Sequence, residues 1–161
     1  MKRIIGVIGE SEFSDPGHQS LAEDVGRLIA RAGYLLVCGG LSGVMEAACR
    51  GAKSAGGQTV GILPGTDSDE ANPFVDIAIP TGMGQARNVI IALAADALIA
   101  IGGGFGTLSE IGYGLKAGKP VIGLRTWDVA RGGLRAPIVV ADTPERALEE
   151  VARALAESKR R

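Results

Sequence analysis

Two glycine-rich segments are the part of the sequence best suited to binding an anion. Gly39 to Gly43 reads GGLSG and Gly102 to Gly106 reads GGGFG, each between an apolar run and a helical pattern. A turn without Cβ atoms lets backbone N–H groups approach an anion, and the following helix adds its positive dipole end. One such turn can use glycine for geometry alone, whereas two at one sheet edge favour phosphate binding. The expected ligand contacts are Gly39, Gly40, Ser42, Gly43, Gly103, Gly104, Phe105, Gly106 and Thr107.

Glu110, which follows the second segment, has two compatible interpretations. Thr107 and Glu110 have the spacing of a capping box, in which Thr107 caps a helix and the glutamate reaches back to its N–H. Alternatively, the carboxylate lies beside a phosphate site, where repulsion by the bound anion would raise its pKa and suit it to acid–base chemistry.

Arg87 lies in the first turns of a predicted helix, after the flexible turn at residues 81–84. A cation at this place opposes the helix dipole, and its guanidinium group matches a phosphate. A surface ion pair is the alternative. His18 is expected at the surface, and Cys38 and Cys49 are expected to be small buried side chains.

Several common kinds of binding site are excluded because their sequence motifs are absent. Neither glycine segment contains the Gly-Lys-Ser/Thr of a P-loop, and residues 9–14 read GESEFS, which is no dinucleotide-binding fingerprint. One histidine and two cysteines are too few for a structural zinc site, so no metal site is expected.

Short apolar runs alternate with helical patterns along the whole chain. Strands are predicted at residues 3–8, 34–38, 59–63, 76–79, 97–101, 121–124 and 138–140. Helices are predicted to begin near Pro16 and end before Gly33, at 44–55, 83–94 and 107–117, and from Thr143-Pro144 onward, with 125–137 irregular. This alternation is typical of the α/β class, here a three-layer Rossmann-like fold with a parallel sheet of six or seven strands flanked by helices. Right-handed crossovers place the carboxyl ends of the strands, where ligands bind, at one edge.

Length and charge limit the classes of partner. The 161 residues fit one domain, residues 1–161, and the net charge of −1 predicts no nucleic-acid partner. No apolar stretch approaches the roughly 20 residues of a membrane span, and nothing near Met1 resembles a signal peptide. A cytoplasmic protein without a membrane partner is therefore expected. The basic end, residues 159–161, is expected to be solvated.

Four stretches resemble a known family. GGGFGTLSE (Gly102–Glu110) resembles the PGGxGTxxE signature of the LONELY GUY family and its lysine-decarboxylase-like relatives. GGLSGVME (Gly39–Glu46) is similar to their GGGxxGLMG motif, and MGQARN (Met83–Asn88) lies where they have MxxRK. KAGKPVI (Lys116–Ile122) is similar to the branch of molybdenum cofactor carrier proteins and DprA-related proteins. The resemblance covers nearly the whole chain and implies the same Rossmann-like fold.

The resemblance implies two different functions. LONELY GUY enzymes hydrolyse the N-glycosidic bond of cytokinin nucleoside 5′-monophosphates. The motif match would make Arg87 and Glu110 the catalytic pair, with Gly103 to Thr107 at the phosphate. A carboxylate suits this reaction because the transition state resembles an oxocarbenium ion. Members of the carrier branch instead bind a phosphorylated pterin cofactor or an anion and need not convert it.

Departures from the signature favour the carrier branch. Gly102 replaces the proline, Asn88 replaces a lysine, Ser109 replaces an acid, and Leu41 and Glu46 stand at positions that are usually small or glycine. The main hypothesis is a binding protein for a phosphorylated nucleotide-like or pterin-like molecule. The alternative is a nucleoside 5′-monophosphate phosphoribohydrolase.

Neither hypothesis requires a resident cofactor. The bound molecule would be a nucleotide, phosphate or a molybdopterin-type ligand, and no lysine stands out for the Schiff base of a pyridoxal-phosphate decarboxylase. DNA binding by analogy with DprA is disfavoured by the charge balance. The resemblance also implies a homodimer or homotetramer.

Overall fold

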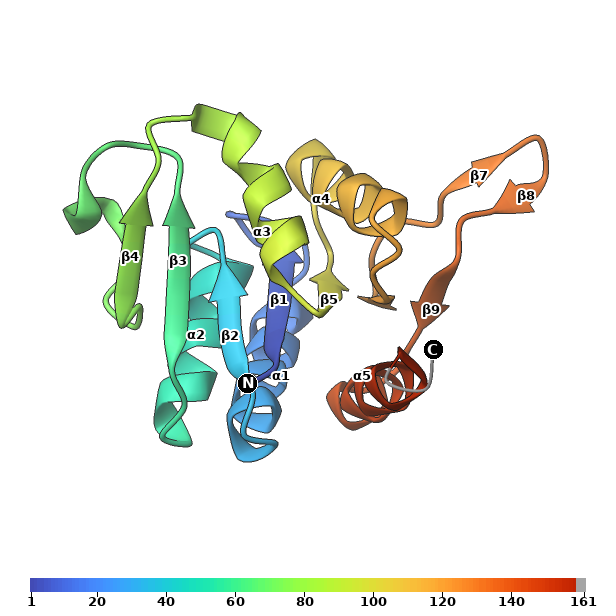
Figure 1. Cartoon of the computed structure of the whole chain (residues 1–161), viewed down its shortest axis with the longest axis horizontal. Helices are drawn as coiled ribbons and strands as arrows, with labels where there is room; N and C mark the ends of the chain where they lie inside the picture. Colours follow the sequence, from blue (N-terminus) through green and yellow to red (C-terminus); the bar gives the residue numbers. More distant parts are fainter. Residues whose placement is uncertain (159–161) are drawn as a thin grey trace.

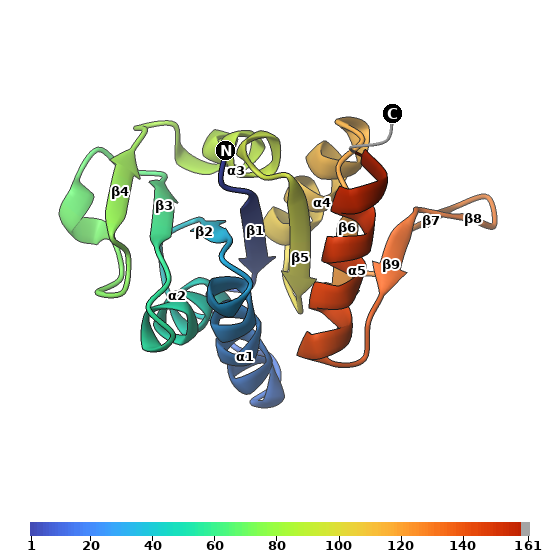
Figure 2. The ribbon, with the colours of Figure 1, turned by 60° about the horizontal axis from the view of Figure 1, so that its bottom comes forward.

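The computed structural model of the chain describes residues 1–158. Its main strands are β1 (Ile4–Gly9), β2 (Leu35–Cys38), β3 (Thr59–Leu63), β4 (Ile77–Pro80), β5 (Ala97–Ile101), β6 (Val121–Leu124) and β9 (Ile138–Val140). Within the described residues these seven strands form one parallel sheet in the order β4-β3-β2-β1-β5-β6-β9 (Figures 1 and 2). The order reverses between β1 and β5, so the two halves of the fold diverge there.

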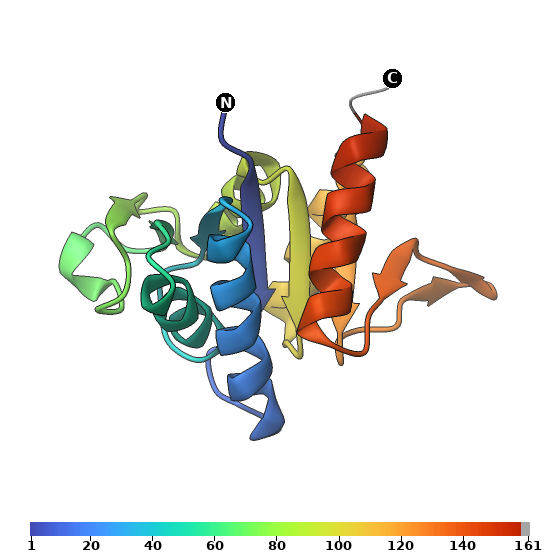
Figure 3. The same ribbon diagram turned by 90° about the horizontal axis from the view of Figure 1, so that it is seen from below.

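In the part of the chain that the structure describes, five α-helices cover both faces of this sheet. They are α1 (Gly17–Arg31), α2 (Val44–Ser54), α3 (Asn88–Ala94), α4 (Phe105–Lys116) and α5 (Pro144–Ser158). Helices α1, α2 and α5 lie on one face and α3 and α4 on the other, as Figures 2 and 3 show. Two short 3₁₀ helices, η1 (Ser68–Glu70) and η2 (Gly84–Arg87), precede β4 and α3. The fold is therefore three-layered and Rossmann-like.

The strands are apolar because both faces of the sheet are covered. Every residue of β5 is buried, and so is every residue of β6. One apolar cluster fills the space between the sheet and α1, α2 and α5, and a second lies between the sheet and α3 and α4. Two-sided burial explains why these strands read as continuous apolar runs without polar alternation.

Helices α1 and α2 pack with their backbones in direct contact. A Cβ added at Gly26 of α1 would lie 1.9 Å from the carbonyl oxygen of Ala48, and one at Gly51 of α2 would lie 1.9 Å from that of Glu23. The nearest atoms at both glycines belong to the backbone of the other helix. Backbone atoms cannot move aside as the end of a flexible side chain can. This contact fixes α2, and with it the first glycine segment, against the rest of the fold.

Gly26→Ala should therefore destabilise the protein by about 3 kcal/mol or more, because overpacking here forces the two helices apart. Urea denaturation of the wild type and the variant measures this difference. Gly112→Ala in α4 is the matched control, since no atom lies within 4 Å of its added Cβ. The control should gain about 0.5–1 kcal/mol of stability from alanine's better helix propensity. Equal effects in the two variants would contradict the interpretation.

Most predicted boundaries agree with the structure, and three regions differ. The strands at 59–63, 97–101, 121–124 and 138–140 have the predicted bounds. The helix predicted at 83–94 divides into η2 and α3, and the helix predicted to start at residue 107 starts at Phe105. The irregular segment 125–137 contains a hairpin of β7 (Ala130–Arg131) and β8 (Leu134–Arg135) that projects from the sheet edge (Figure 1). The basic end at 159–161 lies outside the described residues.

Candidate functional site

The two glycine segments meet at the carboxyl edge of the sheet, beside a cavity of about 620 Å³. This volume is in the range of small-molecule sites. The cavity lies where β1 and β2 end and where η2 and α4 begin. Seven of the predicted site residues line it: Gly39, Arg87, Gly104, Phe105, Gly106, Thr107 and Glu110.

The other four predicted ligand contacts lie outside the lining of this cavity. Gly40 and Gly43 have φ angles of 75° and 67°, a left-handed region that favours glycine, and thus serve the turn between β2 and α2. The Ser42 hydroxyl donates to the carbonyl of Ser11, which ties this turn to the one after β1. The amide of Gly103 donates to the carboxylate of Glu10 at 3.3 Å and is therefore already occupied.

Arg87 is buried in the wall of the cavity, with 5% of its surface exposed. Its Nη1 donates to Asn88 Oδ1 and its Nη2 to the Gly39 carbonyl at 3.5 Å. Among the described residues, nothing accepts a hydrogen bond from Arg87 Nε. Burial lowers the pKa of Arg87, and the nearby Glu110 carboxyl opposes this. The alternative of a surface ion pair for Arg87 is wrong, because η2 turns the side chain inward. The buried guanidinium therefore keeps one unused hydrogen-bond donor, Nε.

Asn88, which sequence reasoning left without a role, connects η2 to α4. Its Nδ2 donates to the Gly106 carbonyl at 3.4 Å and to Ser109 Oγ at 3.2 Å, while its Oδ1 accepts from Arg87. A lysine at this position could not accept that hydrogen bond. The amide therefore holds the guanidinium group and the second glycine segment in one arrangement.

The capping box predicted for Thr107 and Glu110 is not formed. Helix α4 begins at Phe105, its N-cap is Gly104, and no side-chain cap bond is made there. The first helical hydrogen bond runs from the Leu108 amide to the Gly104 carbonyl at 3.1 Å. Thr107 and Glu110 are therefore inside the helix, because glycine at 104 allows α4 to start two residues earlier than the capping pattern suggests.

Glu110 is buried on the cavity wall with 6% exposure. Burial raises the pKa of this carboxyl to about 8, although the Arg87 guanidinium opposes the shift. The direction agrees with the prediction, but its cause is desolvation rather than repulsion by an anion. At neutral pH Glu110 is therefore mostly a neutral acid, and the positive charge of Arg87 is not cancelled.

The first turn of α4 offers further donors. The amides of Phe105, Gly106 and Thr107 precede the first helical hydrogen bond, and no described residue accepts from them. Such amides carry the positive end of the helix dipole. Together with Arg87, they make this cavity suited to an anionic group.

An exposed aromatic side chain stands at the rim of the cavity. Phe105 is 81% exposed, and its ring centroid lies 5.6 Å from that of Trp127, with the planes tilted by 38°. Trp127 Nε1 donates to the Gly104 carbonyl at 3.2 Å, which fixes the indole. A supported aromatic face beside an anion site suits a flat heterocycle that bears a phosphate.

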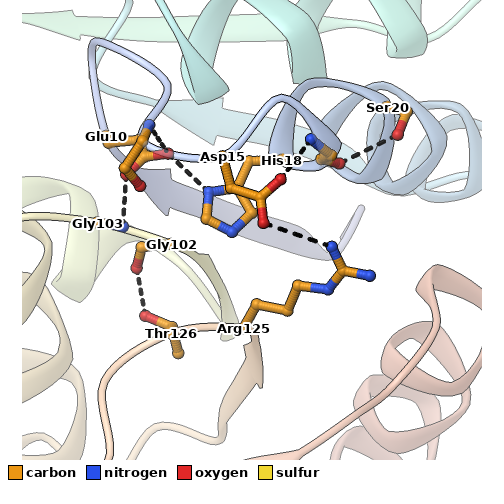
Figure 4. Close-up of polar contacts among 10 residues, drawn as sticks. Glu10, Asp15, His18, Ser20, Gly102, Gly103, Arg125 and Thr126 are labelled. Atoms are coloured by element: carbon orange, nitrogen blue, oxygen red, sulfur yellow. Dashed lines mark hydrogen bonds and ion pairs between the residues drawn. The ribbon is translucent and has the colours of Figure 1, made fainter.

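A Glu10–His18 pair beside the second glycine segment was missed by sequence reasoning (Figure 4). His18 Nδ1 lies 2.7 Å from Glu10 Oε1, and Glu10 also accepts from the Ser14 amide and hydroxyl and from Gly103 N–H. Burial would raise the pKa of Glu10, but these bonds outweigh it and hold the pKa at about 2. The prediction of a surface histidine is wrong, because the first turn of α1 packs the ring against this carboxylate. The only sequence signal was an acidic residue directly after a buried strand.

Gly102 is required by the same pair. Its φ is 54°, and an added Cβ would lie 2.6 Å from His18 Nδ1. Proline, which the resembling signature has here, fixes φ near −65° and could not adopt this conformation. Glycine in place of the signature proline at position 102 therefore makes room for His18 and Glu10.

Cys38 and Cys49 are buried as predicted, with their Sγ atoms 3.5 Å apart. Within residues 1–158, no group of three His, Cys, Asp or Glu side chains is placed to hold a metal ion. In the same part of the chain, no helix has the length and apolar character needed to cross a membrane.

Comparison with known proteins gives relatives of two kinds. The chain is 42% identical to the molybdenum cofactor binding protein of the phototrophic bacterium Rippkaea orientalis, with a TM-score of 0.89 over 96% of this chain and 98% of that one. It is 41% identical to the molybdenum cofactor carrier protein of Chlamydomonas reinhardtii, with a TM-score of 0.85 over 96% and 99% of the two chains.

The second kind of relative is enzymatic. The chain is 33% identical over 126 residues to the cytokinin riboside 5′-monophosphate phosphoribohydrolase of Mycobacterium tuberculosis, covering 71% of this chain and 67% of that protein. The sequence profile of the SLOG cluster4 family matches residues 2–160. The chain therefore belongs to the SLOG cluster4 family.

Proposed function

We propose that this protein binds and carries a phosphorylated pterin-like or nucleotide-like molecule in the 620 Å³ cavity. The observation that carries the proposal is the state of Arg87. Its guanidinium is buried, its Nε has no acceptor among the described residues, and the neighbouring carboxyl of Glu110 is neutral at pH 7. A buried cation with an unused donor is costly unless an anion completes it.

The remaining parts of the cavity suit the same ligand. The free amides at the start of α4 add donors for phosphate oxygens, and the exposed face of Phe105 can stack on a flat heterocycle. Pterins and nucleobases share these two features, a flat ring system and an attached phosphate. The proteins from Rippkaea and Chlamydomonas, which match nearly the whole chain, support a molybdopterin-type molecule as the cargo.

A neutral Glu110 favours binding over hydrolysis. Stabilising an oxocarbenium-like transition state requires a negative carboxylate near the sugar ring. With its pKa near 8, Glu110 is mostly uncharged at neutral pH, and a bound phosphate would favour the uncharged form further.

The second candidate, a nucleoside 5′-monophosphate phosphoribohydrolase, is favoured by one specific observation. A buried carboxylic acid with a pKa of about 8 is protonated at neutral pH and can donate a proton to a departing nucleobase. Arg87 lines the same cavity and could hold the substrate phosphate. The relationship to the mycobacterial enzyme agrees with this candidate.

The deciding experiment measures binding and turnover on one preparation. Small molecules released by denaturing the purified protein are identified by mass spectrometry, and the emptied protein is titrated calorimetrically with AMP, GMP and a molybdopterin preparation. Base release from the nucleotides is followed in parallel. We expect saturable binding without base release. Base release that disappears in a folded Glu110→Gln variant would instead establish the hydrolase.

A further inference from the structure

A second, separate cavity of about 290 Å³ lies beside the start of α1, and neither proposed function uses it. Gly102 and Gly103 line this cavity, whereas Gly104 and Gly106 line the larger one. Its polar lining includes the side chains of His18, Arg125 and Thr126. The second glycine segment thus has a cavity at each end.

His18 presents an unused nitrogen to this cavity. Its side chain is 7% exposed, and its Nδ1 is held by Glu10 at 2.7 Å. Among the described residues, no hydrogen-bond partner contacts Nε2, which in Figure 4 points away from Glu10 toward the space bounded by Gly102, Thr126 and Arg125. A nine-tenths-buried ring with one open nitrogen is the arrangement expected where a ligand completes the hydrogen bonding.

The Glu10 carboxylate decides which proton His18 carries. With a pKa of about 2, Glu10 is ionised and can only accept, so Nδ1 carries a proton. When the ring is neutral, Nε2 therefore offers a lone pair to the cavity. The charge of Glu10 is already met by donors from His18, Ser14 and Gly103.

Arg125 supplies the positive charge of the cavity. It has a φ of 49° and is the one non-glycine residue of the described chain with a positive φ. Its side chain is 58% exposed, and its Nη1 lies 3.9 Å from Asp15 Oδ2, an ion pair too long for a good hydrogen bond (Figure 4). The adjacent Thr126 hydroxyl is used, because it donates to the Gly102 carbonyl. Among the described residues this long ion pair is the one polar contact of the guanidinium, so the group can still pair with an incoming anion.

We propose that this cavity binds a singly protonated phosphate-type oxyanion between His18 Nε2 and the guanidinium of Arg125. Such an anion has an O–H that can donate to the lone pair of Nε2 and oxygens that can accept from Arg125. The proton stays shared between the oxygen and the imidazole, and no bond is broken. The carboxylates of Glu10 and Asp15 disfavour an oxyanion that carries no proton at the same place.

Comparing the binding of phosphate with that of sulfate distinguishes this proposal from simple charge attraction. The two ions have the same shape, but sulfate carries no proton at pH 7 and cannot donate to Nε2. His18 is the single histidine of the chain, so its imidazole NMR signals need no assignment. We expect inorganic phosphate to shift these signals saturably, with a Kd of about 1 mM or below, and sulfate at equal ionic strength to bind at least about tenfold more weakly.

Two variants locate the anion. Arg125→Gln should weaken the binding of phosphate, measured by the His18 signals, by at least about tenfold. Arg125→Gly should do the same, and because glycine suits the positive φ at this position, it replaces the glutamine variant if that variant does not fold. Arg87→Gln, in the wall of the larger cavity, should leave the effect unchanged. No saturable shift with phosphate, or equal binding of sulfate, would overturn the proposal. So would an effect that Arg87→Gln removes and Arg125→Gln retains, because the anion would then occupy the larger cavity.

Discussion

Arg87→Gln is expected to weaken the binding of AMP or of a molybdopterin-type ligand by roughly 100-fold or more. The side chain is buried in the cavity wall and keeps an unused Nε donor, so a bound phosphate would receive charge-assisted hydrogen bonds from it. Glutamine keeps a side-chain amide donor but has no charge. Calorimetric titration of the wild type and the variant with the same ligand measures the loss.

The fold should survive this substitution. Burying an arginine whose Nε lacks an acceptor costs stability, and removing the charge relieves that cost. Urea denaturation should therefore show a free energy of unfolding equal to or above that of the wild type. Arg135→Gln on the exposed hairpin is the matched control and should bind normally. Undiminished affinity in a folded Arg87→Gln variant would refute the assigned role.

Glu110→Gln is expected to stabilise the protein by an amount that grows with pH. The Glu110 pKa is about 8 in the folded protein and near 4.5 without burial, so between these values the folded state binds more protons than the unfolded state. The wild type then loses stability as pH rises from about 4.5 to 8 and loses no more from this group above that. Glutamine does not titrate, so the variant escapes this loss, which is on the order of a few kcal/mol.

Urea denaturation of both proteins from pH 4.5 to 9 measures this difference. The advantage of the variant should be smallest near pH 4.5, rise by about 1 kcal/mol per pH unit and level off above pH 8. A difference independent of pH would mean that Glu110 is not buried as an acid. Because the variant is expected to be the more stable protein at neutral pH, a loss of base release in it could not be attributed to unfolding.

The two substitutions test one electrostatic arrangement from opposite sides. Burial keeps Glu110 neutral, and this neutrality leaves the charge of Arg87 free for an anion. The same pKa predicts that a bound anion and an ionised Glu110 exclude one another. If the cavity binds an anion as proposed, the proton of Glu110 lies next to the bound molecule, and whether that proton is ever transferred separates a carrier from a hydrolase.

Much of the fold could be predicted because its cause is local in the chain. A strand such as Ala97–Ile101 is apolar throughout, since a central parallel strand is covered on both faces. The glycine segments, Arg87 and Glu110 were found for a similar reason. The carboxyl ends of parallel strands share one edge, so residues that follow different strands are brought together by topology alone.

Features that depend on contacts between distant segments could not be predicted. Glu10 receives hydrogen bonds from His18 on α1 and from Gly103, which is 93 residues away, and no sequence period reports such a pairing. The start of α4 was misplaced because the Thr107–Glu110 spacing fits a capping box, whereas the chain is already helical from Phe105, after the N-cap Gly104.

The sequence by itself determined the layered parallel fold, the sheet edge at which the two glycine segments meet, and the placement of Arg87 and Glu110 at that edge. Only the tertiary structure decided the protonation of Glu110, the unused donor of Arg87 and the second cavity at His18. Periodicity and glycine usage encode which segments become strands and turns. A charge state or an open hydrogen bond instead depends on which atoms remain within about 3 Å after the whole chain has packed.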